Sequence, residues 1–301
     1  MDLIQALLVI FAIIALGIIC ERVKAFNHHH TEGLQLFLFK IGMPCYLFIA
    51  TLHHDIASLI HVPYIACYLL SLFGVMTLVL SLFKKEGPSA LCVKILASGY
   101  SNTAIYTLPI VTILLKDPSA AIMATLMQVT IVQTTFVSTL TFLHHKEQSL
   151  LRKLLRAFGT PLIIMPILGL SFNVLGINPY PLVITTVQSL GEGASGLALF
   201  TFGLTVGSIS LNRETVTKSL ISIVLLKNVA HPLIAFMLGK YVFHLDPYWL
   251  YALVIAASAP TAFVVYLIAK QFDHEPELIK RVVGLSAMAS LLFLVLAGMI
   301  L

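Results

Sequence analysis

Three consecutive polar residues interrupt one of the most apolar parts of the chain. Ser101, Asn102 and Thr103 stand in the stretch ASGYSNTAIYTLPIV, residues 97–111, and Pro109 follows them. Polar side chains and unpaired backbone groups cost free energy in hydrocarbon unless another group satisfies them. The stretch therefore predicts a broken helix that builds a binding site, or else a kink whose polar groups are satisfied by neighbouring helices.

A related stretch, AASAPTAFVVYLIAK, occupies residues 256–270, so that residues 259–262 align with residues 101–104. Because proline removes a backbone donor, Pro109 frees the carbonyl of Ile105 and Pro260 frees that of Ala256. A break in each stretch leaves the N-terminus of a half-helix near the membrane centre, where its positive end favours an anion. The freed carbonyls could instead hold a cation such as Na+.

The candidate substrate site consists of polar residues and prolines from both stretches. Asn102 and the backbone around it would bind an anionic head group, and Pro109 and Pro260 would maintain the breaks. The full candidate set is Ser101, Asn102, Thr103, Pro109, Ser258, Pro260 and Thr261.

Charged residues inside apolar segments are costly and therefore point to function. Lys40 is expected to neutralise a substrate carboxylate or to pair with Glu192, which stands in the sequence GEGASG. Glu192 is the candidate proton carrier, because a buried carboxylate can change its protonation state; an ion pair with Lys40 or Lys227 is the alternative. Lys227 and His231 share a helix face, for packing or for a proton relay. Gln128 and Gln133 either bond between helices or line a water-filled path.

The elements that must position these residues are membrane helices. The chain has 301 residues, of which 59% are hydrophobic and 10% charged, too little charge for a soluble surface. Apolar runs of about 20 residues, the length that spans a bilayer, recur from end to end. Ten spans are expected at residues 3–20, 34–52, 62–83, 90–115, 119–142, 158–175, 181–207, 215–242, 247–270 and 280–301.

The ten spans divide into two repeats of five, at residues 1–143 and 158–301, joined by a cytoplasmic linker at 144–157. An odd number of spans forces the second repeat to be inverted in the membrane, an architecture of many secondary transporters. The loops after spans 1, 3, 5, 7 and 9 hold 13 Lys and Arg residues, and the opposite loops hold only two. This bias places both termini outside the cytoplasm of a multi-pass cell-membrane protein of the bacterial inner-membrane type.

Other classes of function lack their signatures. The histidines at 28–30, 53, 54 and 61 show no ligand spacing, and the four cysteines are scattered, so neither a metal site nor a disulfide framework is expected. The sequence contains no phosphate-binding loop and no catalytic motif, so neither a cofactor nor an enzyme activity is expected. The basic charge reflects the loop bias and does not indicate nucleic acid.

At these residues the chain resembles the auxin efflux carrier family, and in particular its short bacterial members. Asn102 and Pro109 keep the spacing of that family's fourth span, G-N-x-G-F-x-G-x-P, and residues 260–270 match its ninth, M-P-x-A-x-N-x-x-x-x-A-[KRQ]. The segments GMPCYLF, LALFTFGLTVG and LLKNVAHPLIAFML resemble its second, seventh and eighth spans. Ala104 and Thr107 replace family glycines, and Val264 replaces the asparagine of span 9.

The resemblance implies an all-α, ten-span inverted-repeat carrier whose broken spans 4 and 9 cross at the binding site. We therefore expect a secondary transporter that moves a small organic anion, a carboxylate, by alternating access, with H+ or Na+ as coupling ion. A sodium-coupled organic-anion symporter of the bile-acid type is one alternative. A membrane sensor that binds a ligand at the same site without transporting it is the other. Homodimer formation is left open.

Overall fold

The computed structural model describes residues 3–53, 60–144, 160–208 and 216–300, and this part of the chain is helical. The predicted linker, 144–157, lies almost entirely outside the described residues, as do His54 and Asp55. Within the described ranges, the β-structure consists of one isolated bridge between Ser101 and Thr261.

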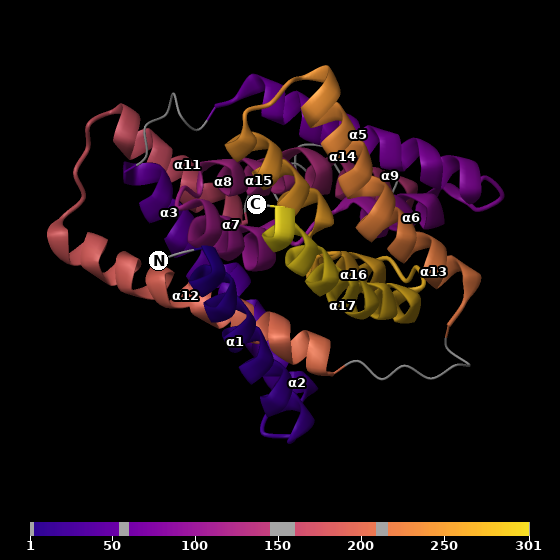
Figure 1. The fold of residues 1–301 in the computed structure, drawn as a ribbon, viewed down its shortest axis with the longest axis horizontal. Coiled ribbons are helices and arrows are strands. Elements are labelled where there is room, and N and C mark those ends of the chain that lie inside the picture. Colours follow the sequence, from indigo (N-terminus) through magenta and orange to yellow (C-terminus); the bar gives the residue numbers. More distant parts are fainter. Residues whose placement is uncertain (1–2, 54–59, 145–159, 209–215, 301) are drawn as a thin grey trace.

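Each of the ten predicted segments contains helix, and several include a π-helical turn, labelled η (Figure 1). In chain order the elements are α1 (Leu3–Arg22); α2 (His28–Phe37), η1 (Leu38–Gly42) and α3 (Met43–His53); α5 (Val62–Leu82); α6 (Pro88–Gly99), η2 (Thr103–Thr107) and α7 (Leu108–Leu115); α8 (Ser119–Met127), η3 (Gln128–Gln133) and α9 (Thr134–His144); α11 (Pro161–Val174); α12 (Pro181–Gly207); α13 (Lys218–Leu225), η5 (Leu226–Ala230), α14 (His231–Met237) and η6 (Leu238–Val242); α15 (Pro247–Ser258) and α16 (Phe263–Gln271); and α17 (Pro276–Ile300).

Several of these helices have the length and apolar character of membrane spans. Four continuous helical stretches in the described residues meet both criteria: His29–His53, Val62–Leu82, Ser119–His144 and Lys218–Val242. Shorter apolar helices include the two halves of the predicted fourth span, Pro88–Gly99 and Thr103–Leu115, and also Pro247–Ser258. The chain is therefore a polytopic, all-helical membrane protein.

The helices form two groups, which lie on opposite sides of the view in Figure 1. In the first group, α1 packs against α12, and α3 packs against both α11 and α12. In the second group, α5 packs against α6 and α14, α14 packs against α15, and α16 packs against α17. The groups meet where α12 contacts η2, α7 and α17.

Small residues allow the helices of the first group to approach closely. A Cβ atom added at Gly203 of α12 would lie 2.2 Å from the carbonyl oxygen of Ile14, and one added at Gly17 of α1 would lie 2.2 Å from that of Phe200. Close packing of this kind replaces the hydrophobic effect as the force between helices in lipid.

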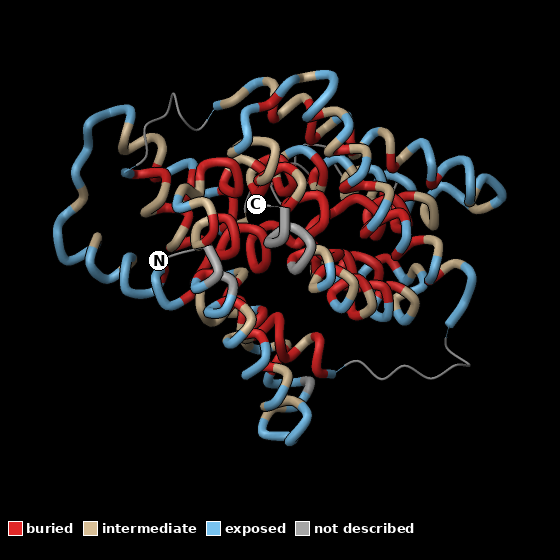
Figure 2. The backbone as a smooth tube through the Cα atoms, viewed as in Figure 1, coloured by how far each residue is buried: buried red, intermediate tan, exposed pale blue. Residues whose placement is uncertain are grey.

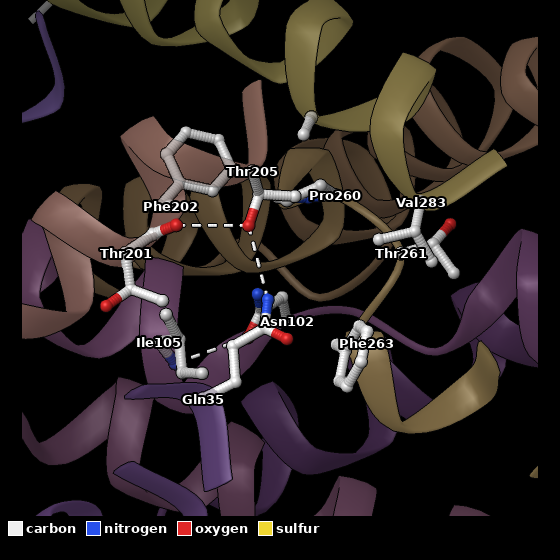
Figure 3. Close-up of a pocket in the computed structure, with 11 residues that line it drawn as sticks. Gln35, Asn102, Ile105, Thr201, Phe202, Thr205, Pro260, Thr261, Phe263 and Val283 are labelled. Carbon is white, nitrogen blue, oxygen red and sulfur yellow. Dashed lines mark hydrogen bonds between the residues drawn. The ribbon is translucent and has the colours of Figure 1, made fainter. Parts of the chain in front are cut away.

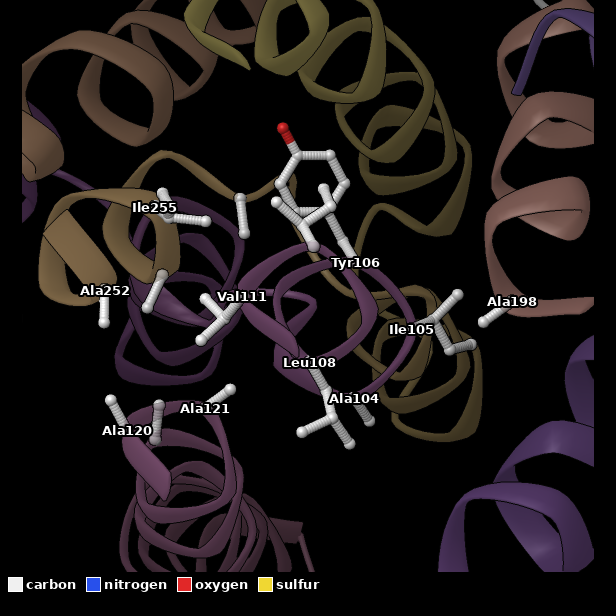
Figure 4. Close-up of a cluster of buried hydrophobic side chains, with 14 of the residues drawn as sticks. Ala104, Ile105, Tyr106, Leu108, Val111, Ala120, Ala121, Ala198, Ala252 and Ile255 are labelled. Atoms are coloured by element: carbon white, nitrogen blue, oxygen red, sulfur yellow. The ribbon is translucent and has the colours of Figure 1, made fainter. Parts of the chain in front are cut away.

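The most buried backbone lies in the middle of the molecule, around η2 and α7 (Figure 2). In Figure 4, alanines from α8, α12 and α15 surround these two elements, among them Ala121, Ala198 and Ala252. This packed centre holds the interrupted segments in place.

Candidate functional site

Two helix breaks meet at the centre of the molecule. The chain leaves α6 after Gly99 and resumes at η2, and it leaves α15 after Ser258 and resumes at α16. The two segments pair through one antiparallel bridge: the amide of Asn102 donates to the carbonyl of Pro260 at 2.8 Å, and the amide of Ala262 donates to the carbonyl of Tyr100 at 3.2 Å. Each break thus satisfies backbone groups of the other, which makes interrupted helices tolerable inside a membrane.

The crossing lies at Asn102 and Pro260 as the sequence predicts, but Pro109 has a different position. The first break covers residues 100–102, and Pro109 lies beyond it, near the start of α7. The π-helical turn Thr103–Thr107 joins the break to that proline. Pro260, in contrast, lies within the second break.

The polar side chains of the two breaks mainly satisfy backbone groups. The Asn102 side-chain oxygen accepts from the amide of Ile105 at 3.3 Å and so caps the N-terminus of η2. The Thr261 hydroxyl donates to the carbonyl of Ala97 at 2.6 Å, and the Ser258 hydroxyl donates to that of Ile255 at 3.1 Å. These bonds explain how the polar residues of the opening motif are accommodated.

A small cavity of about 10 Å³ lies against the crossing, at the N-terminal ends of η2 and α16 (Figure 3). Asn102, Pro260, Thr261 and Phe263 line it from the breaks. Its other walls come from α2, α12 and α17, and include Gln35, Thr201 and Thr205. A volume of this size holds about one water molecule.

Two side-chain oxygens in the wall of this cavity are buried and have no hydrogen-bond partner among the described residues. They belong to the side chains of Gln35 and Thr201. The Gln35 amide nitrogen is engaged, because it donates to the Thr205 hydroxyl at 3.2 Å. Buried polar atoms without partners are uncommon in folded proteins, which marks this cavity as a candidate binding position.

Gln35 and Phe263 also line a second cavity, of about 680 Å³, which lies between the two helix groups. Lys40 and His29 line it from the first group, and Lys270 lines it from the second. Val264, at the N-terminus of α16, lines it too. The larger cavity thus combines basic side chains and the carboxylate of Glu32 with the positive end of a half-helix, and this helix end is the part of the cavity that favours an anion.

Gln133 reaches the larger cavity and Gln128 does not. Gln133 lines it and accepts a hydrogen bond from the Tyr100 hydroxyl at 2.9 Å. Gln128 is fully buried and donates to the Tyr68 hydroxyl. Gln133 therefore lines a cavity, whereas Gln128 forms an interhelical bond.

Lys227 lies at the crossing itself and is fully buried. Its ammonium nitrogen is 2.9 Å from the Ser101 hydroxyl, 2.7 Å from the Ala257 carbonyl and 3.3 Å from Nδ1 of His231. Sequence spacing relates Lys227 to His231, but it does not predict that the lysine reaches both breaks.

The expectation that Glu192 is buried is wrong. Glu192 is exposed on α12, where its carboxylate accepts a hydrogen bond from Gln188 at 2.6 Å. The glycine before it, Gly191, packs directly on the backbone of α3 near Tyr46, which turns Glu192 away from that contact. Lys40 is also exposed, and the two residues line different cavities.

Several residues around the site are not among those that the sequence predicts. Gln35, Thr201, Thr205 and Ser286 belong to it; the Ser286 hydroxyl accepts from the amide of Thr261 at 3.0 Å. Thr201 and Thr205 are four residues apart, a spacing that places them on one helix face and could have identified a polar stripe. Among the described residues, no group of three His, Cys, Asp or Glu side chains could hold a metal ion.

Comparisons with known proteins agree with this architecture. The model of a family described as membrane transport protein matches residues 2–151 and 145–297. A protein of Rhizobium meliloti (strain 1021), named "Putative malonate transporter", is 27% identical over 144 residues; the alignment covers 46% of this chain and 44% of that protein. The chain thus spans about half the length of this curated relative. Because the family match extends over nearly the whole chain, the protein belongs to the auxin efflux carrier-like family of membrane transport proteins.

Proposed function

We propose that this protein is a secondary transporter of small carboxylates, of the dicarboxylate class that malonate represents. The observation that carries the proposal is the position of the α16 N-terminus. Phe263, the first residue of α16, lines both cavities, and the larger cavity also presents Lys40 and Lys270. A carboxylate in the larger cavity would meet the basic side chains first and the helix end at the crossing next.

The packing of the helices supports a ten-span layout of two repeats. The repeat relates the first span to the sixth and the second span to the seventh. A contact between the first and seventh spans should therefore be matched by a contact between the sixth and second spans. The structure contains both packing pairs, α1 with α12 and α11 with α3. The contacts of α5 with α6 and of α14 with α15 form a second such pair. Matched contacts of this kind are expected of two similar halves related by a two-fold axis.

Alternating access would follow from movement between the two helix groups. The larger cavity lies between them, and its lining includes His29 and Lys270, which lie at helix ends that the Lys and Arg bias assigns to the cytoplasm. In this orientation both termini lie outside the cytoplasm and the cavity faces inward. Shifting one group against the other would close this cavity and open the site to the opposite side.

Flux in proteoliposomes tests the proposal. Uptake of labelled malonate and of related mono- and dicarboxylates would be measured for the wild type, for Asn102→Ala and for Asn178→Ala, an exposed asparagine between α11 and α12. We expect uptake by the wild type and by Asn178→Ala, and loss of uptake in Asn102→Ala, because the freed η2 N-terminus disorders the site.

Imposed pH and Na+ gradients, applied separately, would identify the coupling ion. Uptake that requires a Na+ gradient would favour the symporter of the bile-acid type. Binding of carboxylates by the wild type without any flux would contradict transport and favour a sensor.

A further inference from the structure

Lys227 is a buried cation without a carboxylate partner among the described residues. Its three contacts are all with neutral groups, namely Ser101, Ala257 and His231. Lys94, the other buried lysine in the described part of the chain, has two carboxylate partners, Glu86 and Glu275. An ammonium in a protein interior is costly unless it is compensated, so the surroundings of Lys227 must supply the compensation by another route.

The hydrogen bonds around Lys227 fit a charged ammonium group. An ammonium has three donors, and three acceptors surround it. His231 Nδ1 accepts from Lys227, which leaves the proton on Nε2; that atom lies 3.2 Å from the Ser71 hydroxyl. The Ser71 hydroxyl donates in turn to the carbonyl of Tyr68 at 2.7 Å. With Lys227 as the donor, the network assigns the proton of His231 to Nε2.

The negative end of one half-helix and a side-chain hydroxyl from the other break provide the compensation. The Ala257 carbonyl belongs to the last turn of α15, and Ser101 follows the end of α6 by two residues. Carbonyl groups at a helix C-terminus carry partial negative charge that stabilises a nearby cation. Lys227 lines neither cavity described above, whereas the N-terminal ends of η2 and α16 border the small one.

The crossing therefore has one side that favours an anion, at the N-terminal ends of η2 and α16, and one side that favours a cation, at the Ala257 carbonyl. Unwound carbonyls and half-helix C-termini are the groups that coordinate Na+ in many transporters with broken helices. We propose that the Lys227 ammonium is a built-in cation that occupies such a position, so that this carrier binds its anion without Na+. The proposal rests on the proposed function as regards transport, but the cation preference of the crossing can be measured without substrate.

A pair of substitutions separates this role from simple packing. Lys227→Ala removes the charge and leaves space beside the Ala257 carbonyl, whereas Lys227→Met removes the charge and fills the space. Lys240→Ala, at an exposed lysine of the same helical stretch, is the matched control. Malonate uptake would be compared in Na+ medium and in choline medium, and the melting temperature of each purified protein would be measured in both.

The wild type and Lys240→Ala are expected to transport equally well in both media. Malonate uptake by Lys227→Ala in choline medium should be at least about tenfold slower than uptake by the wild type, because the cation is missing from its site. Na+ should restore much of this uptake. Lys227→Met should be slow in both media. Na+ should raise the melting temperature of Lys227→Ala alone.

Three results would overturn the proposal. The first is malonate uptake by the wild type that depends on Na+. This result can be interpreted even if the variants do not fold. The second is a folded Lys227→Ala whose uptake and melting temperature ignore Na+. The third is equal rescue of Lys227→Met by Na+. If malonate crosses in neither medium, the proposed substrate class fails, and the Na+ effect on melting temperature still decides the role of Lys227.

Discussion

Gln35 lines both cavities, and its side-chain oxygen is buried without a hydrogen-bond partner among the described residues. A substrate that moves from the larger cavity toward the crossing would pass this amide. Gln35→Ala is expected to raise the KM for malonate by roughly 10- to 150-fold, since the second N–H of the Gln35 amide can donate to a carboxylate and a hydrogen bond to a charged group contributes about 1.5–3 kcal/mol. Uptake kinetics in proteoliposomes would measure the change.

Gln271→Ala, at an exposed glutamine at the end of α16, is the control for Gln35. It should leave the KM unchanged. Equal KM values for Gln35→Ala and the wild type would remove Gln35 from the substrate path.

The environment of Glu192 does not suit a proton carrier. The carboxylate is exposed on α12 and is bonded to Gln188. Glu192→Gln is therefore expected to retain uptake within about twofold of the wild type, as exposed substitutions usually have small effects. Uptake driven by a pH gradient would be compared for the two proteins, and loss of the pH response in the variant would restore Glu192 as the proton carrier.

The backbones of α1 and α12 approach each other closely at Gly17 and Gly203. Gly203→Ala is expected to lower the stability by about 1–3 kcal/mol, because the added methyl group would overlap the Ile14 carbonyl and force the helices apart. Gly193→Ala, in the same helix, meets nothing within 4 Å and should be neutral or stabilising by up to about 1 kcal/mol. Melting temperatures in detergent would rank the variants, and an unchanged value for Gly203→Ala would contradict the close approach.

Features that depend on local chemistry can be predicted from the sequence. Asn102 and Pro260 reveal the breaks because a polar cap and a missing backbone donor interrupt a helix wherever it lies. Lys227 could not be placed in this way, because its role depends on which face of its helix meets the crossing. Glu192 was misplaced because its flanking glycines suggest a loosened, buried helix, whereas Gly191 is needed for contact with α3.

Gln35 and Thr201 were missed for a related reason. Single polar residues in an apolar helix do not show whether they face lipid, another helix or a cavity. Only the packing of α2 and α12 beside the crossing brings the two side chains together (Figure 3). The sequence could thus predict where the helices break, but not which distant residues complete the site.

In the whole molecule, the two helix groups enclose a cavity of about 680 Å³, which serves as the access path in the proposed function. The crossing joins two half-helix N-termini next to the small cavity, and it places the C-terminus of α15 and the Ser101 hydroxyl next to Lys227. This separation of charge would give an anion a positive environment while the lysine neutralises the opposite side. Both features depend on the breaks being in register, as the bridge between Ser101 and Thr261 shows.

Counterflow of malonate tests the central claim, transport of a small carboxylate at the crossing, most directly. Proteoliposomes loaded with unlabelled malonate would be diluted into labelled malonate, and accumulation of label would be followed for the wild type and Asn102→Ala. The account predicts transient accumulation above equilibrium in the wild type and none in a folded Asn102→Ala. Wild-type protein that binds malonate but shows no counterflow, or equal counterflow in both proteins, would contradict it.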